Sequence, residues 1–190
     1  MTTAQDIRDF WFADGPNTRR LIWFQVNPAF DASCRNLCAA LLAPAREGAL
    51  DHWTETIEGT LALLLLLDQM PRNIHRGQAA AFASDMQARA VARAALARGV
   101  DQQLSPAQRG FIYLPFEHSE DIADQDLSVR LFTALCDEPD YSNPARTLDI
   151  VRRHREVIRQ FGRFPHRNAA LGRVSTVAEA DYLARPGAGF

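Results

Sequence analysis

Three short stretches of the chain combine ionisable side chains with aromatic and aliphatic residues. They are residues 67–77, 113–121 and 161–168. Four of the five histidines lie in or beside these stretches, namely His75, His118, His154 and His166. An imidazole titrates near neutral pH, and a neighbouring carboxylate fixes its tautomer, so a histidine–carboxylate pair is suited to general acid–base catalysis. These stretches therefore contain the best candidates for chemistry.

The candidate acid–base residues are His118 and His166, with Asp68 and Asp121 as their carboxylate partners. Glu117 lies four residues before Asp121, so in a helix the two carboxylates would share a face beside His118. Such a pair would serve a hydrolase or a lyase.

Arginines near these histidines indicate a second possibility, because a guanidinium binds carboxylate or phosphate through paired hydrogen bonds. If the three stretches meet, we expect a polar pocket for a small anionic metabolite or a peptide terminus. The candidate ligand-binding residues are Arg72, His75, Arg76, His118, Asp121, His154, Arg163, His166, Arg167, Asn168 and Arg173. Two alternatives stay open: a buried hydrogen-bond network that only locks the loops together, and a protein-interaction scaffold with the motifs as supports.

Composition excludes several classes of function. The 190 residues suit a single domain, 1–190, and a net charge of -2 gives no reason to expect nucleic acid or a membrane as partner. Lysine is absent, so a Schiff-base lysine and a P-loop lysine are excluded. Three cysteines without a CxxC pair, and no HExxH or GxGxxG motif, indicate no metal and no cofactor. Nothing in the sequence indicates an oligomeric state.

Charge is unevenly distributed along the chain. Residues 119–140 contain seven acidic residues, the last of them Asp140, and one arginine, whereas residues 146–173 contain eight arginines and two acids. Neighbouring helices of opposite charge would pair, or the arginine-rich segment would form an anion site.

Helical periodicity recurs along the whole sequence, and no segment alternates as a strand does. Capping boxes are expected at Thr3 and Ser84, a helix start at Ser105 and a helix cap at Thr176. A buried central helix is expected over residues 56–70, with Pro71 ending it. The fold class is all-α, with antiparallel helical hairpins stacked in a tetratricopeptide-like array or an irregular bundle.

The N-terminus contains no basic region followed by an apolar one, as a signal peptide would. The apolar run 61–67 is far shorter than the ~20 residues of a spanning helix. We therefore expect a cytoplasmic protein.

Five motifs together resemble the bacterial family called domain of unknown function 924. They are Asp9-Phe10-Trp11-Phe12, Trp23-Phe24 and the motif-bearing residues 67–73, 113–121 and 162–168, and the resemblance runs to the closing residues 186–190. It implies a tetratricopeptide-like helical fold but no activity, substrate or cofactor. Glu117 stands where the family commonly has methionine, so we expect Asp121 and His118, rather than Glu117, to line the pocket.

Overall fold

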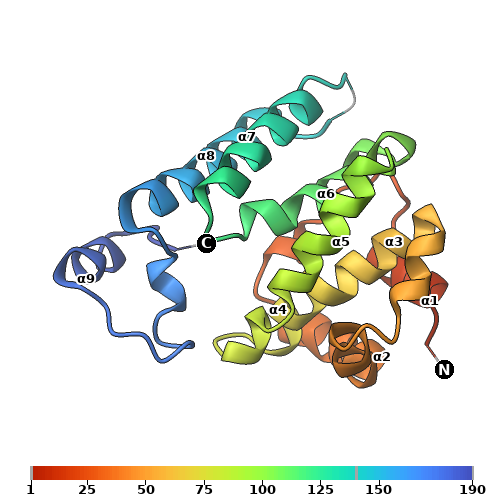
Figure 1. Cartoon of the computed structure of the whole chain (residues 1–190), viewed down its shortest axis with the longest axis horizontal. Coiled ribbons are helices and arrows are strands. Elements are labelled where there is room, and N and C mark those ends of the chain that lie inside the picture. The colour runs from red at the N-terminus through yellow and green to blue at the C-terminus, as the bar shows by residue number, and fades with distance from the viewer. Residues whose placement is uncertain (1, 140, 190) are drawn as a thin grey trace.

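The computed structural model describes residues 2–139 and 141–189, where all regular structure is helical, as expected (Figure 1). Asp140 and Phe190, which belong to the acidic segment and to the closing motif, lie outside these residues. The α-helices are α1 (Ala4–Trp11), α2 (Pro28–Arg46), α3 (Ile57–Leu64), α4 (Met70–Ile74), α5 (Asp85–Ala97), α6 (Pro106–Glu117), α7 (Ile122–Cys136), α8 (Pro144–Phe161) and α9 (Val177–Leu183).

The capping box expected at Thr3 is confirmed, and the helix starts expected at Ser105 and Thr176 are capping boxes too. Thr3, Ser105 and Thr176 each accept a hydrogen bond from the backbone three residues later, and the side chain at that later position bonds back. Each box thereby satisfies two backbone N–H groups at the helix start, that of the N-cap residue and that of the third helical residue. At the other end, Gly162 adopts a left-handed conformation, with φ of 68°, and ends α8 as expected.

The prediction that Pro71 ends the central helix is wrong. The chain continues from α3 through a π-helical segment, Leu65–Gln69, into α4, so the helix passes Pro71 and ends at Ile74. Proline lacks an N–H, and a π-helical segment changes which carbonyl faces which donor, so the helix can pass the ring. Asp68 and Arg72 therefore lie within a continuous helical segment rather than on either side of a break.

The capping box expected at Ser84 is also wrong. Ser84 precedes α5, but its side chain makes no capping hydrogen bond. Its hydroxyl instead donates to the carbonyl oxygen of Leu67, at 2.5 Å. Pro71, four residues after Leu67, has no N–H to offer that carbonyl, so the hydroxyl supplies a donor from another element.

The central segment is the most buried part of the chain, as its all-round apolar composition predicts. Every residue from Leu61 to Leu67 is at most 2% exposed. It packs against α1, α2, α5 and α6 in one hydrophobic cluster that also includes stacked Trp11 and Trp23. This rigid centre holds the side chains at positions 68–72 in fixed places.

The helices α7 and α8 lie antiparallel beside α6 on one flank of the molecule, and α9 lies beyond them (Figure 1). A small second cluster of Val157, Ile158 and Phe164, with Phe161 and Tyr182 packed on it, joins the end of α8 to α9. Pro115 lies inside α6, which ends two residues later at Glu117. Among the described residues no helix is long and apolar enough to cross a membrane.

Candidate functional site

A cavity of about 970 Å³ lies along α6 and α8 and is closed by residues of α4, of the loop before α2 and of the segment after α8. Six of the residues expected to bind a ligand line it: Arg72, Arg76, His118, His154, His166 and Arg167. All three polar stretches contribute to this set. The structure therefore brings them together around one cavity.

At one end of the cavity, Asp68 holds His118. Nδ1 of His118 lies 2.8 Å and 3.0 Å from the two carboxylate oxygens of Asp68. Gln69 donates a further hydrogen bond to the same carboxylate at 2.6 Å. Burial would raise the pKa of Asp68, but the charge of Arg72 and the bond from His118 outweigh it and hold that pKa well below its usual range.

The imidazole of His118 is neutral at pH 7, because burial and the nearby charge of Arg72 lower its pKa despite the Asp68 carboxylate. An ionised carboxylate accepts the proton on Nδ1, which fixes the tautomer and leaves Nε2 as the unprotonated nitrogen. His118 lines the cavity, and Asp68 lies buried behind it. This arrangement is that of a general base with its positioning carboxylate.

Asp85 joins the two arginines of the site. Arg72 donates two hydrogen bonds to its carboxylate, at 2.9 Å and 3.0 Å, and Nη1 of Arg167 lies 3.4 Å from the same group. Sequence analysis assigned Asp85 only to a capping box and so missed this role. Asp85 follows Ser84 at a helix start, which suggested a local role, whereas its contact with Arg167 joins residues 82 positions apart.

Arg167 is a buried cation with spare hydrogen-bond donors. Its guanidinium carbon lies 4.7 Å from the ring centroid of Phe82 and 4.4 Å from that of Phe164, and its side chain is nearly inaccessible. Nε is buried without a hydrogen-bond partner among the described residues. Burial and the charge of Arg72 lower its pKa to about 10. Because Arg167 lines the cavity, an anion bound there would lie beside its positive charge.

Glu117 and His154 form the neutral part of the site. Nδ1 of His154 donates to the carbonyl of Ile150 at 2.9 Å and lies 3.3 Å from Oε1 of Glu117. Burial, reinforced by the charge of Asp68, raises the pKa of Glu117 to about 8, so its carboxyl group is protonated at pH 7. Burial also keeps the pKa of His154 well below its usual value, so this imidazole is neutral.

Glu117 is buried and lines the cavity, whereas Asp121 is exposed. The carboxylate of Asp121 accepts from the backbone N–H of Ala123 and caps α7. Asp121 was expected to line the pocket in preference to Glu117, but Glu117 lines the cavity and Asp121 does not. The adjacency of Glu117 and His118 at a helix end was the signal for Glu117, and the departure from the family pattern obscured it.

Four other expected residues lie outside the cavity lining. Arg163 makes paired hydrogen bonds to Glu179, and Asn168 joins that pair at 3.4 Å. Arg173 makes paired bonds to Glu120 at 2.7 Å and 2.9 Å. The remaining residue is His75, whose backbone ends α4. Arg163 thus joins the end of α8 to α9, and Arg173 ties the segment after α8 to the loop between α6 and α7.

His166 and the C-terminal segment form part of the cavity wall. Burial and the charge of Arg167 lower the pKa of His166 to about 4, so the imidazole is neutral at pH 7. Gly189 has φ of +83°, and a Cβ there would lie 3.4 Å from Cβ of His166. Arg153 holds this segment by donating to the carbonyl of Gly187 at 2.7 Å.

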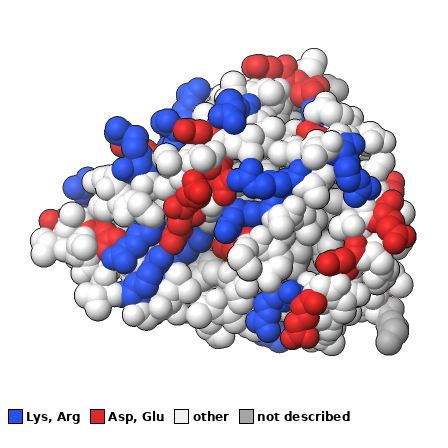
Figure 2. Space-filling model, in the orientation of Figure 1, with Lys and Arg blue, Asp and Glu red and all other residues white. Residues whose placement is uncertain are grey.

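The uneven charge along the sequence is partly resolved by pairing. Asp124 forms ion pairs with Arg89 and Arg93, and Asp126 pairs with Arg155. Acidic and basic residues accordingly lie side by side over the face in Figure 2. Around the cavity the balance differs, since six arginines line it against the two carboxyl groups of Glu117 and Asp149.

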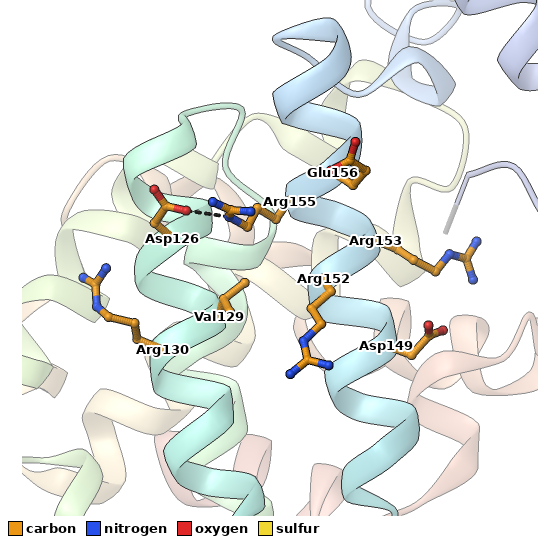
Figure 3. Close-up of a pocket in the computed structure, with 8 residues that line it drawn as sticks. All are labelled: Asp126, Val129, Arg130, Asp149, Arg152, Arg153, Arg155 and Glu156. Atoms are coloured by element: carbon orange, nitrogen blue, oxygen red, sulfur yellow. Dashed lines mark hydrogen bonds and ion pairs between the residues drawn. The ribbon is translucent and has the colours of Figure 1, made fainter.

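A second hollow, of about 630 Å³, lies over the surface of α7 and α8 (Figure 3). Its lining carries four arginines and three acids, and Arg155 bonds to Asp126 across it at 2.5 Å. Most of these side chains are exposed, so water screens their charges. Over the described residues, no three histidine, cysteine or acidic side chains are grouped to hold a metal ion.

The comparisons with known proteins are consistent with the sequence motifs. A solved structure, the "Protein of Unknown Function ATU0120 from Agrobacterium tumefaciens", is 41% identical to this chain, with a TM-score of 0.83; the match covers 95% of this chain and 96% of the other. The chain has no significant match among curated proteins. Residues 7–187 match the family described as "Bacterial protein of unknown function (DUF924)". The chain therefore belongs to this bacterial family.

Proposed function

We propose that the cavity binds a small organic anion through the guanidinium of Arg167. The observation that carries this proposal is a cation that lines the cavity, is 6% exposed and lies over two aromatic rings. Its contact with Asp85, at 3.4 Å, is a long one. Leaving a buried charge poorly paired is costly, and a carboxylate or phosphate oxygen bound beside the guanidinium would relieve that cost.

The size and lining of the cavity support the same proposal. About 970 Å³ lies at the upper end of the usual range for small-molecule sites, roughly 300–1,000 Å³. The lining combines polar side chains around His118 with apolar ones such as Phe111, Leu114 and Phe132. An anion with an apolar body fits such a site better than a free inorganic ion.

A titration with defined probes tests the proposal. Acetate, glutarate, inorganic phosphate and a tripeptide with a free carboxyl terminus would be titrated into the protein by isothermal calorimetry. We expect at least one organic carboxylate to bind, and Arg167→Gln to weaken binding by about 10- to 100-fold, as the loss of a charged hydrogen bond does. Arg159→Gln is the matched control, because Arg159 is exposed and pairs with Glu156 on the surface.

The result also separates the alternatives. Binding of the tripeptide alone would favour recognition of a peptide terminus. If no probe binds and Arg167→Gln lowers the melting temperature, the site is a structural network and the binding proposal fails.

We also propose that the helices form a tetratricopeptide-like array. The antiparallel pair α7–α8 is the kind of helical hairpin that such an array repeats, and it forms one wall of the cavity. A protein-interaction scaffold would use the concave side of that array.

A further inference from the structure

Two groups suited to proton transfer lie at the same end of the cavity. Glu117 and His118 are consecutive residues at the end of α6, and both line the cavity. His154 connects them: its Nδ1 lies 3.3 Å from Oε1 of Glu117, and its ring centroid lies 6.5 Å from that of His118. The ring of Phe164, which stacks on Arg167, contacts His154 with centroids 5.6 Å apart.

We propose that this end of the cavity hydrolyses a carboxylic ester, with His118 as general base and Glu117 as general acid, on a substrate whose anionic group binds Arg167. The inference rests on the proposed function, because Arg167 must first hold the substrate. Asp68 is a positioning residue, since it touches His118 and not the substrate.

The opposite protonation of two neighbouring carboxyl groups supports these roles. Asp68 is ionised, because Arg72 and His118 stabilise its charge, whereas burial raises the pKa of Glu117 to about 8. When their surroundings push the pKa values of two carboxyl groups apart in this way, the protonated group is suited to donate a proton and the ionised group to assist a base. The ionised Asp68 leaves Nε2 of His118 free of a proton, and the neutral Glu117 has a proton to give.

Water is the nucleophile in this proposal. No cysteine lines the cavity in the described part of the chain, and the lining hydroxyls, Tyr141, Ser142 and Thr147, come from the start of α8 and the loop before it. The hydroxyl oxygens of Tyr141 and Thr147 lie 3.4 Å apart and engage each other. Burial also raises the pKa of Tyr141. We therefore take water as the nucleophile.

The chemical step balances with water as the only co-reactant. Nε2 of His118 removes a proton from water as its oxygen forms a bond to the acyl carbon of the ester. The bond from that carbon to the alcohol oxygen breaks, and the alcohol leaves with the proton of Glu117. The proton on His118 then returns to Glu117 through solvent, so one ester and one water yield one acid and one alcohol.

An apolar wall of the cavity indicates what kind of group the substrate carries besides its ester and its anionic group. Leu114 and Phe111 lie four and seven residues before His118 on α6, and Phe132 of α7 lines the same wall. This wall extends roughly 10 Å from the proposed reacting centre, at 1.5 Å per helical residue. The substrate class is therefore an ester with an apolar portion and a separate carboxylate.

The test compares two alkyl esters, monoethyl glutarate and the neutral ethyl butyrate, because their ethoxide leaving groups need a proton, and the acid released is followed by titration at constant pH. We expect the wild type to hydrolyse the glutarate ester faster than buffer and with at least tenfold higher kcat/KM than the butyrate ester. His118→Asn and Glu117→Gln are each expected to lower kcat by about 100-fold or more, the usual contribution of a general acid or base. Glu117→Gln is the safer variant for folding, because glutamine has the shape and charge of the protonated residue.

The pH dependence distinguishes an acid from a structural residue. Groups that face Glu117 are Asp68 from the π-helical segment, His154 from α8 and Tyr141 from the loop before α8, with His118 next to it. The wild-type kcat should fall as pH rises through about 8, where Glu117 loses its proton. Glu117→Gln should lack this alkaline limb, and Asp68→Asn should shift the acidic limb.

Calorimetry with glutarate separates the two levels of the proposal. If glutarate binds both wild type and His118→Asn but the ester is not turned over, the hydrolytic inference is overturned and anion binding stands. If none of the four calorimetric probes binds and the ester is not hydrolysed, both fail. Retention of wild-type kcat and of the alkaline limb by folded Glu117→Gln would also overturn the inference.

Discussion

Nδ1 of His118 is held between both carboxylate oxygens of Asp68, a residue 50 positions earlier in the chain. Asp68 lies in the π-helical segment between α3 and α4, and His118 ends α6. Such segments interrupt the regular helix and recur at functional sites. Here the interruption lies at the buried carboxylate that orients the imidazole.

Asp68→Asn should destabilise the protein by about 3 kcal/mol, since it removes one charge from a buried ionic cluster. The group that loses a partner is Arg72, 3.3 Å from the carboxylate, which keeps its hydrogen bonds to Asp85. Urea unfolding would measure the change. Asp126→Asn, which breaks an ion pair whose partners are about 40% exposed, is the control and should cost less than about 1 kcal/mol. If the two variants lowered the free energy of unfolding equally, the buried cluster around Asp68 would contribute no more to stability than a surface ion pair.

Glu117→Gln should change how stability depends on pH. The pKa of Glu117 is raised from 4.5 in the unfolded chain to about 8 in the folded protein, so between these values only the folded state holds the proton. Wild-type stability should therefore lose up to about 1.4 kcal/mol per pH unit from this group as pH rises from 4.5 to 8. The difference between the two proteins, from chemical denaturation at several pH values, should follow this slope. A difference independent of pH would refute the raised pKa.

His166 should remain neutral in the folded protein at pH 5.5, because its pKa is lowered to about 4. Unfolded histidine protonates near 6.5, so the unfolded state binds more protons between pH 6.5 and 4, and this group's contribution to stability is lost as pH falls through that window. Imidazole ¹⁵N shifts would report the charge state.

A second variant tests the cause of that lowered pKa. Burial is the largest contribution and the charge of Arg167 the next, so Arg167→Gln should raise the midpoint of the His166 titration. Arg159→Gln, on the exposed face of α8, should leave it unchanged. An unaltered midpoint in Arg167→Gln would show that burial alone sets the value.

Ser84→Ala should destabilise the fold by about 1–3 kcal/mol, because the buried carbonyl of Leu67 loses the hydroxyl that donates to it. Ser33→Ala is the control, since the exposed Ser33 hydroxyl donates to the carbonyl of Ala29 within its own helix. Thermal unfolding of both variants would measure the difference. If the two variants melt together, the Ser84 hydroxyl does not compensate for the missing N–H of Pro71.

The local sequence determined much of the helical structure. The capping boxes at Thr3, Ser105 and Thr176 and the glycine at position 162 mark helix ends through contacts within a few residues. Such contacts depend on residue types at fixed spacing, which a sequence displays directly. The apolar run 61–67 likewise predicted the buried centre, because no face of that helix can meet water favourably.

Pro71 and Ser84 show where local rules failed. A proline ends a helix only when nothing else satisfies the backbone around it, and here the π-helical segment and a hydroxyl from a distant turn intervene. Both depend on contacts between elements, so neither could be read from neighbouring residues.

The residue types of the candidate site were visible in the sequence, but their partners were decided by tertiary structure. Asp68 meets His118 and Asp85 meets Arg167 only because α4, α5, α6 and the segment after α8 pack around one cavity. Burial at that cavity also set the protonation of Glu117, which sequence reasoning placed below the exposed Asp121. Charge state depends on desolvation and on neighbours in space, and these exist only once the chain is folded.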